Sequence, residues 1–339
     1  MRETVSSSFT EFLARHFDQI NDYLATFFDG QATSSDIERY LYTPIAAFSA
    51  NAGKRHRPLI CMLAATAVGG TFESARSAAA AIEHFQSAAL IHDDIADNGQ
   101  LRRGKPCMYL TEGEGIAINC GDLALTMVTK TVLDDDTLEP DVKMRVLHEL
   151  TEMTIRTIEG QALDLGWVRD GRFNITVDDY LDMATHKTAF YSGATPLACG
   201  AIIGGGSDEQ VEALRAFGLH TGLAFQIQDD LINLIGEDSG KDYRTDITEG
   251  KRTLVAVHAL SDARFHDEVE QILSSGTEDP AQLARAVQIF EKTGSIDYAR
   301  SYAFDLTAQA KAALEDIELD PHARELFISM ADFFVERLS

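Results

Sequence analysis

Residues 78–97 of this chain read AAAAIEHFQSAALIHDDIAD. The first part of the stretch is rich in alanine and almost without charge, which predicts a central, buried helix. Because a helix brings residues four apart onto one face, Asp93 and Asp97 stack with the same charge. Two carboxylates placed in this way repel each other unless a cation lies between them. Hard oxygen ligands of this kind suit Mg²⁺, which is usually shared with substrate phosphates.

A second acidic cluster, Gln228-Asp229-Asp230-Leu231-Ile232-Asn233, follows the apolar residues 223–225 and repeats the design. A second metal site that faces the first would make a cradle for a diphosphate. Asn233 contributes no charge, so it could weaken one metal position. A solvated acidic helix end is the plain alternative for either cluster alone, but the apolar run that leads into each cluster favours a site.

The composition describes an acidic protein with enough apolar residues for a large core. The chain has 339 residues, of which 45% are hydrophobic, and a formal net charge of −25. This charge argues against a nucleic-acid binder, which needs a basic face, and against loose attraction to anionic membranes. An anionic substrate would therefore require the scarce lysines and arginines to be concentrated locally.

Two further features bear on location. The four cysteines are widely spaced and form no Cys-x-x-Cys pair, which predicts reduced, buried thiols. The N-terminus lacks the apolar core of a signal peptide. The longest uncharged stretch, residues 191–207, is broken by Pro196 and by three glycines at 204–206, so we expect no membrane span. We expect a cytoplasmic protein.

Helical signals dominate the chain. Segments that resemble N-terminal capping boxes begin at Ser35, Thr176 and Ser207. Alternating strand patterns are nearly absent, and no turn is long or polar enough to be a domain linker. The fold class is therefore predicted to be all-α, with ten or more helices in a single domain over residues 1–339. The part of the chain after about Ser261 is more polar.

Cationic segments accompany the acidic clusters. Residues 53–58 read Gly-Lys-Arg-His-Arg-Pro, which suits a diphosphate-binding helix start, although a solvated basic turn is the alternative. Lys187 shares a helical stripe with Tyr180, and a lysine that faces the core needs an anionic partner. His84 is as easily a satisfied core histidine as a ligand-binding one. Residues 240–253 hold a polar loop that could close over a substrate phosphate.

Taken together and in this order, these motifs resemble those of the trans-isoprenyl (polyprenyl) diphosphate synthases of the short-chain type. The resemblance runs from about Gly53 to Leu254, with a helical C-terminal part from about 255 to 339. It rests on the segments at 53–58, 93–97, 102–104, 160–165, 187–188, 225–230 and 246–254. It implies a single polyprenyl synthase domain, built as an isoprenoid-synthase helical bundle around a central cavity.

The resemblance also implies roles for individual residues. Three Mg²⁺ would be bound by Asp93, Asp97 and Asp229, with Asp94 and Asp230 in support. The allylic diphosphate would be bound by Arg102, Lys187, Thr188, Gln226, Lys241 and Lys251. Isopentenyl diphosphate would be held by Lys54, Arg57, His84 and Arg103. The family's second acidic motif normally ends in Asp, so Asn233 is a departure. A homodimer is implied as well.

The implied reaction is the 1'-4 condensation of isopentenyl diphosphate with an allylic diphosphate, which yields a longer prenyl diphosphate. Metals and cations stabilise the departing diphosphate, so no protein nucleophile is needed. Product length follows from the helix below Asp93. Ala88 and Ala89 leave the first turn open, and Phe85 lies roughly 12 Å from Asp93 as the first plausible floor. We expect a product near C20, within C15 to C25, unless Phe85 packs between helices and another helix sets the limit.

Two other classes share some of these features. A class I terpene cyclase has the same scaffold and both metal sites, but it binds one diphosphate and has little need for Lys54, Arg57 and Arg103. A non-catalytic subunit that modulates a synthase would be expected to have eroded metal motifs, and here the first motif is intact. Consumption of isopentenyl diphosphate by the isolated protein separates these alternatives from a synthase.

Overall fold

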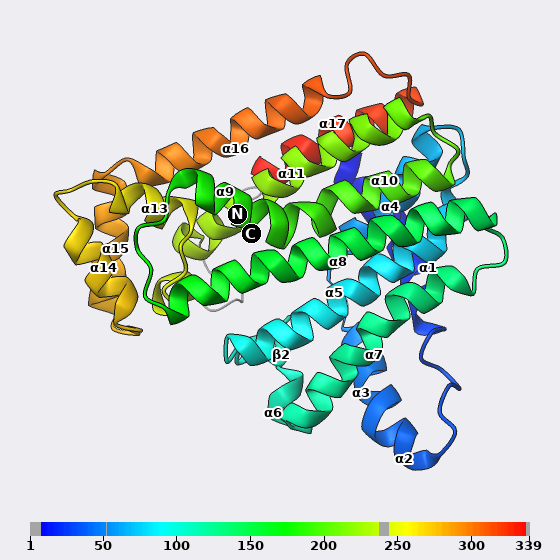
Figure 1. The fold of residues 1–339 in the computed structure, drawn as a ribbon, viewed down its shortest axis with the longest axis horizontal. Helices are drawn as coiled ribbons and strands as arrows, with labels where there is room; N and C mark the ends of the chain where they lie inside the picture. The colour runs from blue at the N-terminus through cyan, green and yellow to red at the C-terminus, as the bar shows by residue number, and fades with distance from the viewer. Residues whose placement is uncertain (1–7, 52, 237–243, 337–339) are drawn as a thin grey trace. The chain divides into compact units, whose positions relative to one another are not determined.

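The computed structural model describes residues 8–51, 53–236 and 244–336, and in these residues the all-α prediction is confirmed. Figure 1 shows the helices that make up the chain. The described residues contain one small antiparallel ribbon, in which β1 (Leu101–Arg102) pairs with β2 (Lys105–Pro106). The described residues form more than ten helices, in agreement with the prediction of ten or more. The chain divides into two compact units, and both draw on separate segments of the sequence.

Unit 1 comprises Met1–Glu152, Thr195–Arg215 and Asp316–Met330. Its helices are α1 (Ser8–Ala25), α2 (Ser35–Ile37), the π-helix η1 (Glu38–Tyr42), α3 (Thr43–Ala50), α4 (His56–Ala67), the 3₁₀-helix η2 (Phe72–Ala75), α5 (Arg76–Ala96), α6 (Met108–Glu112), α7 (Glu114–Leu133) and α10 (Thr195–Ile203), together with the beginnings of α8 (Pro140–Arg169) and α11 (Asp208–Ile235) and most of α17 (Pro321–Glu336).

The alanine-rich helix α5 is the centre of unit 1, as predicted. It packs against α4 and α7, and its residues 77–88 are all buried. Small residues allow this close packing. A Cβ on Gly200 of α10 would lie 2.0 Å from the carbonyl oxygen of Cys61 on α4, and one on Gly121 of α7 would lie 2.2 Å from Nε2 of His92. The helix that ends in the first acidic cluster thus packs closely against α7, and its other neighbour, α4, packs closely against α10.

Unit 2 comprises Met153–Ala194, Ala216–Glu315 and Ala331–Ser339. Its remaining helices are α9 (Val177–Ala184), the π-helix η3 (Thr185–Ala194), α12 (Thr245–Thr248), α13 (Leu254–Leu260), α14 (His266–Ser274), α15 (Pro280–Lys292) and α16 (Ser295–Ala312). The prediction that residues 1–339 form a single polyprenyl synthase domain stays a prediction.

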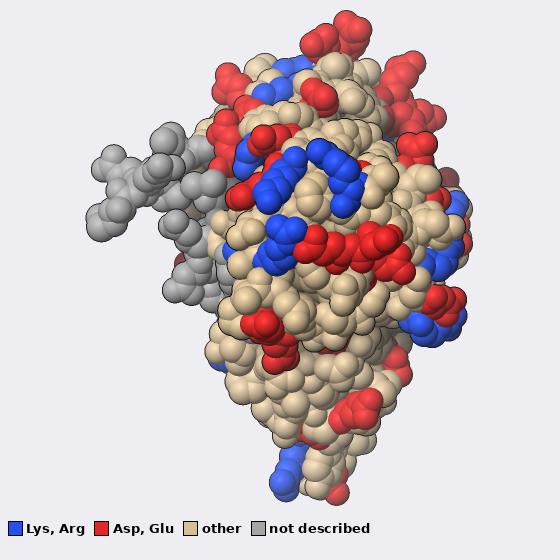
Figure 2. Space-filling model, turned by 90° about the vertical axis from the view of Figure 1, so that its left-hand side faces the viewer, with Lys and Arg blue, Asp and Glu red and all other residues tan. Residues whose placement is uncertain are grey.

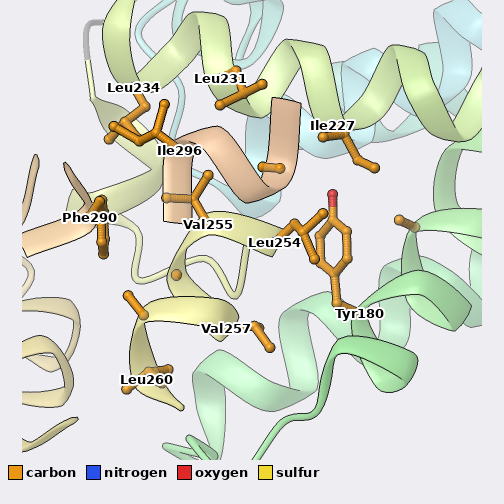
Figure 3. Close-up of a cluster of buried hydrophobic side chains, with 14 of the residues drawn as sticks. Tyr180, Ile227, Leu231, Leu234, Leu254, Val255, Val257, Leu260, Phe290 and Ile296 are labelled. Carbon is orange, nitrogen blue, oxygen red and sulfur yellow. The ribbon is translucent and has the colours of Figure 1, made fainter. Parts of the chain in front are cut away.

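The core of unit 2 surrounds the short helix α13. Side chains from α9, α11, α15 and α16 converge on Leu254 and Val255, and Figure 3 shows this cluster. Tyr180 of α9 is only 1% exposed, and its hydroxyl points towards α11. η3 approaches α11 where both lack side chains, because a Cβ on Gly193 would lie 2.1 Å from the carbonyl oxygen of Gly218. This contact brings the residues of η3 next to the second acidic cluster on α11.

Two of the three predicted capping boxes are present. The side chain of Thr176 accepts from the backbone N–H of Asp179, and the Asp179 carboxylate accepts from the backbone N–H of Thr176. Ser207 and Gln210 exchange the same two bonds. The box at Ser35 is wrong by one residue, because Ser34 is the residue that caps Ile37 and the chain turns into the π-helix η1 after three residues.

On the surface, acidic and basic side chains are interspersed on the face that Figure 2 shows, and no continuous basic field covers it. Among the described residues, α7 alone is long and apolar enough to cross a membrane by length and composition, with a mean hydropathy of 1.3 and 44% of the window buried inside the protein. Its buried side packs against α5, and core helices of this kind meet the same criterion.

Candidate active site

The first acidic cluster lies at the C-terminal end of α5 in unit 1. The helix ends at Ala96, Asp97 is its C-cap, and the N–H of Asp97 donates to the carbonyl of Asp93 over 2.9 Å. Asp93 and Asp97 are therefore one turn apart and partly exposed, as the spacing predicts. The carbonyl end of a helix is an unfavourable place for carboxylates, so a cation bound there would stabilise the arrangement.

Asp94 differs from its two neighbours because it is 2% exposed. Its Oδ1 accepts from Nε of Arg102 over 2.7 Å and also from Nη2 of the same guanidinium. Burial opposes the charge on Arg102, but Asp94 outweighs it and raises the pKa of the guanidinium. The other Asp94 oxygen, Oδ2, is buried without a hydrogen-bond partner among the described residues. Asp94 thus holds Arg102 in place beside Asp93, whose carboxylate lies 3.9 Å from Nη2.

The cationic segment before α4 contains residues of two kinds. Arg55, in the left-handed conformation, is 3% exposed and pairs with the buried Glu83 of α5. Lys54 is exposed, whereas Arg57 is buried in the first turn of α4. Arg103 donates to the carbonyl of Asn51, and burial lowers its pKa despite the attraction of Glu83. All four residues predicted to hold isopentenyl diphosphate, His84 among them, lie in unit 1. The ion pair between Arg55 and Glu83 fixes the segment that contains Lys54 and Arg57 to α5.

His84 is the least accessible of these four residues. It is 1% exposed, and its ring meets those of Phe27 and Phe28 edge-on, at centroid distances of 4.8 and 5.4 Å. Burial, and then the charge of Arg55, lower the pKa of His84 to about 3. Its Nε2 is buried without a partner in the described residues. His84 is therefore neutral, and its predicted role as a ligand stays a prediction.

The three residues predicted to set product length lie on α5 between His84 and Asp93. Phe85 is 3% exposed and Ala88 is 2% exposed, whereas Ala89 is partly exposed. The order of a large ring followed by small side chains towards Asp93 is as the sequence predicts. Their role in product length stays a prediction.

In unit 2, the predicted lysines converge on one carboxylate. Nζ of Lys187 lies 2.6 Å from Oδ2 of Asp164, and Nζ of Lys251 lies 3.1 Å from the same atom. Asp164 is 4% exposed. Burial disfavours its charged form, but Lys187 and then Lys251 outweigh burial and lower its pKa to about 2. The anionic partner that a core-facing Lys187 requires is therefore Asp164, which lies 23 residues earlier in the chain.

The local sequence explains how Lys187 reaches Asp164. A Cβ on Gly160 would lie 2.2 Å from the backbone nitrogen of Lys187, so glycine allows η3 to approach α8. Asp164 follows one turn later on α8, on the side that faces η3. The stripe predicted from Tyr180 to Lys187 is an α-helix only as far as Ala184 and continues as the π-helix η3, a form often found at functional sites.

A chain of side-chain hydrogen bonds connects η3, α11 and α9. The hydroxyl of Thr188 donates to Oε1 of Gln226 over 2.5 Å, and the amide of Gln226 donates to Oδ1 of Asp230 over 2.6 Å. The hydroxyl of Tyr180 donates to Oδ2 of Asp230 over 2.8 Å. Both oxygens of the buried Asp230 are thus engaged, which suits a supporting role. Asp229 is partly exposed.

Asn233 connects α11 to α12. Its Nδ2 donates to the hydroxyl of Thr245 over 2.9 Å, and its Oδ1 accepts from the N–H of Asp246 over 3.2 Å. Burial, and then repulsion from Asp230, raise the pKa of the Asp246 carboxyl. The neutral amide makes both contacts without adding a further negative charge beside these two carboxyls. Lys241, predicted in the allylic site, lies outside the described residues.

Each unit contains its own group of predicted residues. Lys187, Lys251, Thr188, Gln226 and Asp230 belong to one network in unit 2, whereas Asp93, Asp97 and Arg102 belong to unit 1. The sequence interpretation assigned no role to three residues that the network requires. They are Asp164, Tyr180 and Asp246. The motif at 160–165 was the available signal for Asp164, since a polar residue in an apolar helix needs a partner.

The oxygen donors of both clusters fit Mg²⁺ in kind. In residues 8–51, 53–236 and 244–336, no three His, Cys, Asp or Glu side chains gather into a complete metal site. Mg²⁺ is usually held by one or two carboxylates and completes its coordination with water and substrate phosphate. Paired aspartates beside an arginine, with a buried, unpartnered oxygen on Asp94, are compatible with that mode.

Comparison with known proteins identifies the family of the chain. A sequence profile described as polyprenyl synthetase matches residues 38–290. A short chain isoprenyl diphosphate synthase from Methanothermobacter thermautotrophicus is 38% identical over 287 residues, which cover 84% of this chain and 86% of that protein.

Solved structures give the same result. The crystal structure of geranylgeranyl pyrophosphate synthetase from Pyrococcus horikoshii has a TM-score of 0.88 and 31% identity, covering 96% of this chain and 98% of its own. Geranylgeranyl pyrophosphate synthase from Corynebacterium glutamicum, complexed with isoprenyl diphosphate and magnesium, has a TM-score of 0.85 and 28% identity, covering 98% and 99%. The chain therefore belongs to the polyprenyl synthetase family and is a prenyltransferase of the short-chain isoprenyl diphosphate synthase type.

Proposed function

We propose that the protein condenses isopentenyl diphosphate, head to tail, with an allylic diphosphate and releases diphosphate. Family membership supports this reaction. The observation that carries the proposal is the convergence of Lys187 and Lys251 on Asp164. Two ammonium groups held beside one carboxylate are in place before substrate arrives, and a diphosphate has more charge and more acceptors than the carboxylate. The lysines then bind the leaving group.

Asp93, Asp97 and Asp229 are the proposed Mg²⁺ ligands, with three ions per active site. Mg²⁺, when bound, neutralises charge that develops on the departing diphosphate. Asp94 orients Arg102 towards that charge through two hydrogen bonds. Asp230 supports its neighbour through the bonds from Tyr180 and Gln226. The allylic diphosphate is bound by Arg102, Lys187, Thr188, Gln226, Lys241 and Lys251.

Isopentenyl diphosphate is proposed to bind to Lys54, Arg57, His84 and Arg103. The chemical step needs little from the protein beyond placement and charge. The lysines stabilise the diphosphate as the C–O bond breaks, the isopentenyl double bond attacks C1 of the allylic cation, and a proton passes to the released diphosphate.

A product near C20 is proposed, within the range C15 to C25. A relative in the same family from Pyrococcus horikoshii carries the name geranylgeranyl pyrophosphate synthetase, which supports this length. On α5, the buried ring of Phe85 below Ala88 and Ala89 is the proposed floor of the cavity that holds the growing chain.

The test is an assay with labelled isopentenyl diphosphate and primers of five, ten and fifteen carbons, with and without Mg²⁺, in which the products are sized. Consumption of isopentenyl diphosphate only with Mg²⁺, and a product near C20, is the expected result. A terpene cyclase would convert an allylic diphosphate without consuming isopentenyl diphosphate. A non-catalytic subunit would convert neither substrate.

We further propose a cytoplasmic homodimer. Leu110 of α6 and Ile118 and Leu133 of α7 are 47%, 45% and 52% exposed, so a second copy that covered them would bury further apolar surface. Their coverage by a second copy also accounts for the membrane-like hydropathy of α7. The four cysteines are free and buried, as expected in a reducing compartment. Sedimentation equilibrium of the wild type and of Ile118→Glu tests the dimer, which the variant should weaken.

A further inference from the structure

Arg252 lies next to Lys251 in the segment that joins α12 to α13, and it is 2% exposed. Its guanidinium donates to three carbonyl oxygens. Nε donates to Arg172 over 2.8 Å, Nη2 donates to Trp167 over 3.3 Å, and Nη1 donates to Gly250. The guanidinium carbon also lies 3.9 Å from the centre of the Phe173 ring. A side chain engaged in this way is directed into the protein and away from substrate.

The choice of partners is unusual for a buried cation. Burying a guanidinium is costly, and most buried charges are paired with an opposite charge. Arg252 instead serves carbonyls of the last turn of α8 and of the turn that follows it, where the negative end of the helix dipole favours a cation. A planar fork of five donors can reach several carbonyls at once, whereas a lysine ammonium is a point charge on a flexible stem.

The position of Arg252 determines what it can fix. Lys251 reaches Asp164 on α8, and Arg252 grips the carbonyl of Trp167, three residues further along the same helix. The backbone next to Lys251 and Arg252 is tightly packed. Gly250 is left-handed with φ +67°, and a Cβ there would lie 2.6 Å from the Leu273 carbonyl.

The two ends of this segment are also held. The N–H of Lys251 donates to the carbonyl of Asp246 over 2.8 Å, and Asp246 is bound to Asn233 of α11. The side chain of Thr253 caps α13 through the N–H of Ala256. Arg252 is therefore the connection between this segment and the end of α8.

We propose that Arg252 is a positioning residue that fixes Lys251 for binding the allylic diphosphate, without touching the substrate itself. The inference rests on the proposed function, because it assigns to Lys251 the role of a diphosphate ligand. It predicts that Arg252 affects binding of the allylic substrate and leaves binding of isopentenyl diphosphate unaffected, because Lys251 is not among the proposed ligands of isopentenyl diphosphate.

The experiment compares Arg252→Lys and Arg252→Met with the wild type by steady-state kinetics. Loss of one charge-assisted hydrogen bond corresponds to about a tenfold change. We therefore expect the KM for the allylic diphosphate to rise about tenfold in Arg252→Met, with the KM for isopentenyl diphosphate within about twofold of wild type. Arg252→Lys keeps the charge but not the planar fork, so its allylic KM should also rise several-fold. Arg285→Met, which removes a partly exposed arginine paired with Glu268, is the matched control and should change neither KM.

Coupling to Lys251 distinguishes positioning from a general loss of stability. Lys251→Ala should raise the allylic KM, and adding Arg252→Met to it should raise the KM no further, because Arg252 acts through Lys251. Additive effects, or an Arg252→Lys variant with wild-type KM values, would overturn the proposal. A lower thermal midpoint with unchanged kinetics would also overturn it.

Failure of the proposed function gives a different result. If the wild type consumes no isopentenyl diphosphate, the affinity of the site can still be measured by calorimetric titration with inorganic diphosphate in the presence of Mg²⁺. Weaker binding in Arg252→Met and Arg252→Lys than in the wild type would support the positioning role, and equal binding would contradict it. These binding data also apply if Arg252→Met fails to fold, because Arg252→Lys alone then carries the comparison.

Discussion

Replacing His84 by phenylalanine is expected to flatten the dependence of stability on pH. In the folded protein the imidazole lies edge-on to Phe27 and Phe28 and is neutral, with a pKa lowered to about 3. In the unfolded chain it has its ordinary pKa of 6.5. Between these two values the unfolded state binds more protons than the folded state, so stability rises with pH.

The size of the effect follows from the same two values. One unit below the unfolded pKa, at a pH of about 5.5, protonation of the unfolded imidazole removes about 1.4 kcal/mol of stability, whereas at about pH 7.5 it removes almost none. The loss grows as the pH falls towards 3. Phenylalanine cannot take up a proton, so the His84→Phe variant should lose about 1.4 kcal/mol less than the wild type over this interval. At neutral pH, the variant should be at least as stable as the wild type, because the buried Nε2 of His84 has no hydrogen-bond partner among the described residues.

The assay is urea unfolding of both proteins at pH 7.5 and pH 5.5. His322→Phe is the control for the loss of a histidine at an exposed position. If the difference for His84→Phe equals that of the wild type, His84 is not a neutral, buried histidine, and the reasoning is refuted. The KM for isopentenyl diphosphate, measured on the same variant, tests the separate proposal that His84 binds that substrate.

Three further outcomes are expected. Phe85→Ala should lengthen the product, and an unchanged product distribution would exclude this ring as the floor. Gly160→Ala puts a methyl group 2.2 Å from the facing π-helix and should cost about 1–3 kcal/mol in thermal unfolding, whereas Gly166→Ala on the same helix meets nothing within 4 Å and should gain up to about 1 kcal/mol. Tyr180→Phe removes a donor from a buried carboxylate and should cost about 1–3 kcal/mol in urea unfolding, with Tyr302→Phe, at a partly buried site, nearly neutral.

Features that depend on neighbouring residues were predictable from the sequence. The buried helix α5 follows from its run of alanines, and the caps at Thr176 and Ser207 follow from a three-residue spacing. The cap predicted at Ser35 was wrong by one residue because Ser34 and Ser35 are adjacent, and the local sequence does not decide which of them caps the helix. Lys187 was expected to need an anionic partner, but the partner could not be named, since spacing gives no information on which distant carboxylate lies nearby.

Tertiary contacts account for the rest. Asp164 and Lys251 are separated by 87 residues and meet only because α8, η3 and the segment before α13 pack together. Arg252 looks like one more solvated cation in the sequence, yet it is buried among carbonyl groups. The two acidic clusters were predicted to bind the same metals, and their assignment to one site stays a prediction.

The winding of η3 makes this part of the protein tolerant of one change in chain length. A π-helix joins residue i to i+5 and so takes up about one more residue per turn than an α-helix. Deletion of one residue after Thr188 would let one turn rewind as an α-helix, and the smaller number of residues and the larger rotation of each, about 100°, would nearly cancel. Gly193 would then still meet Gly218 at the crossing with α11. The same deletion within an α-helical stretch would turn every later side chain by about 100°, so the additional residue of η3 is the one that this crossing can lose.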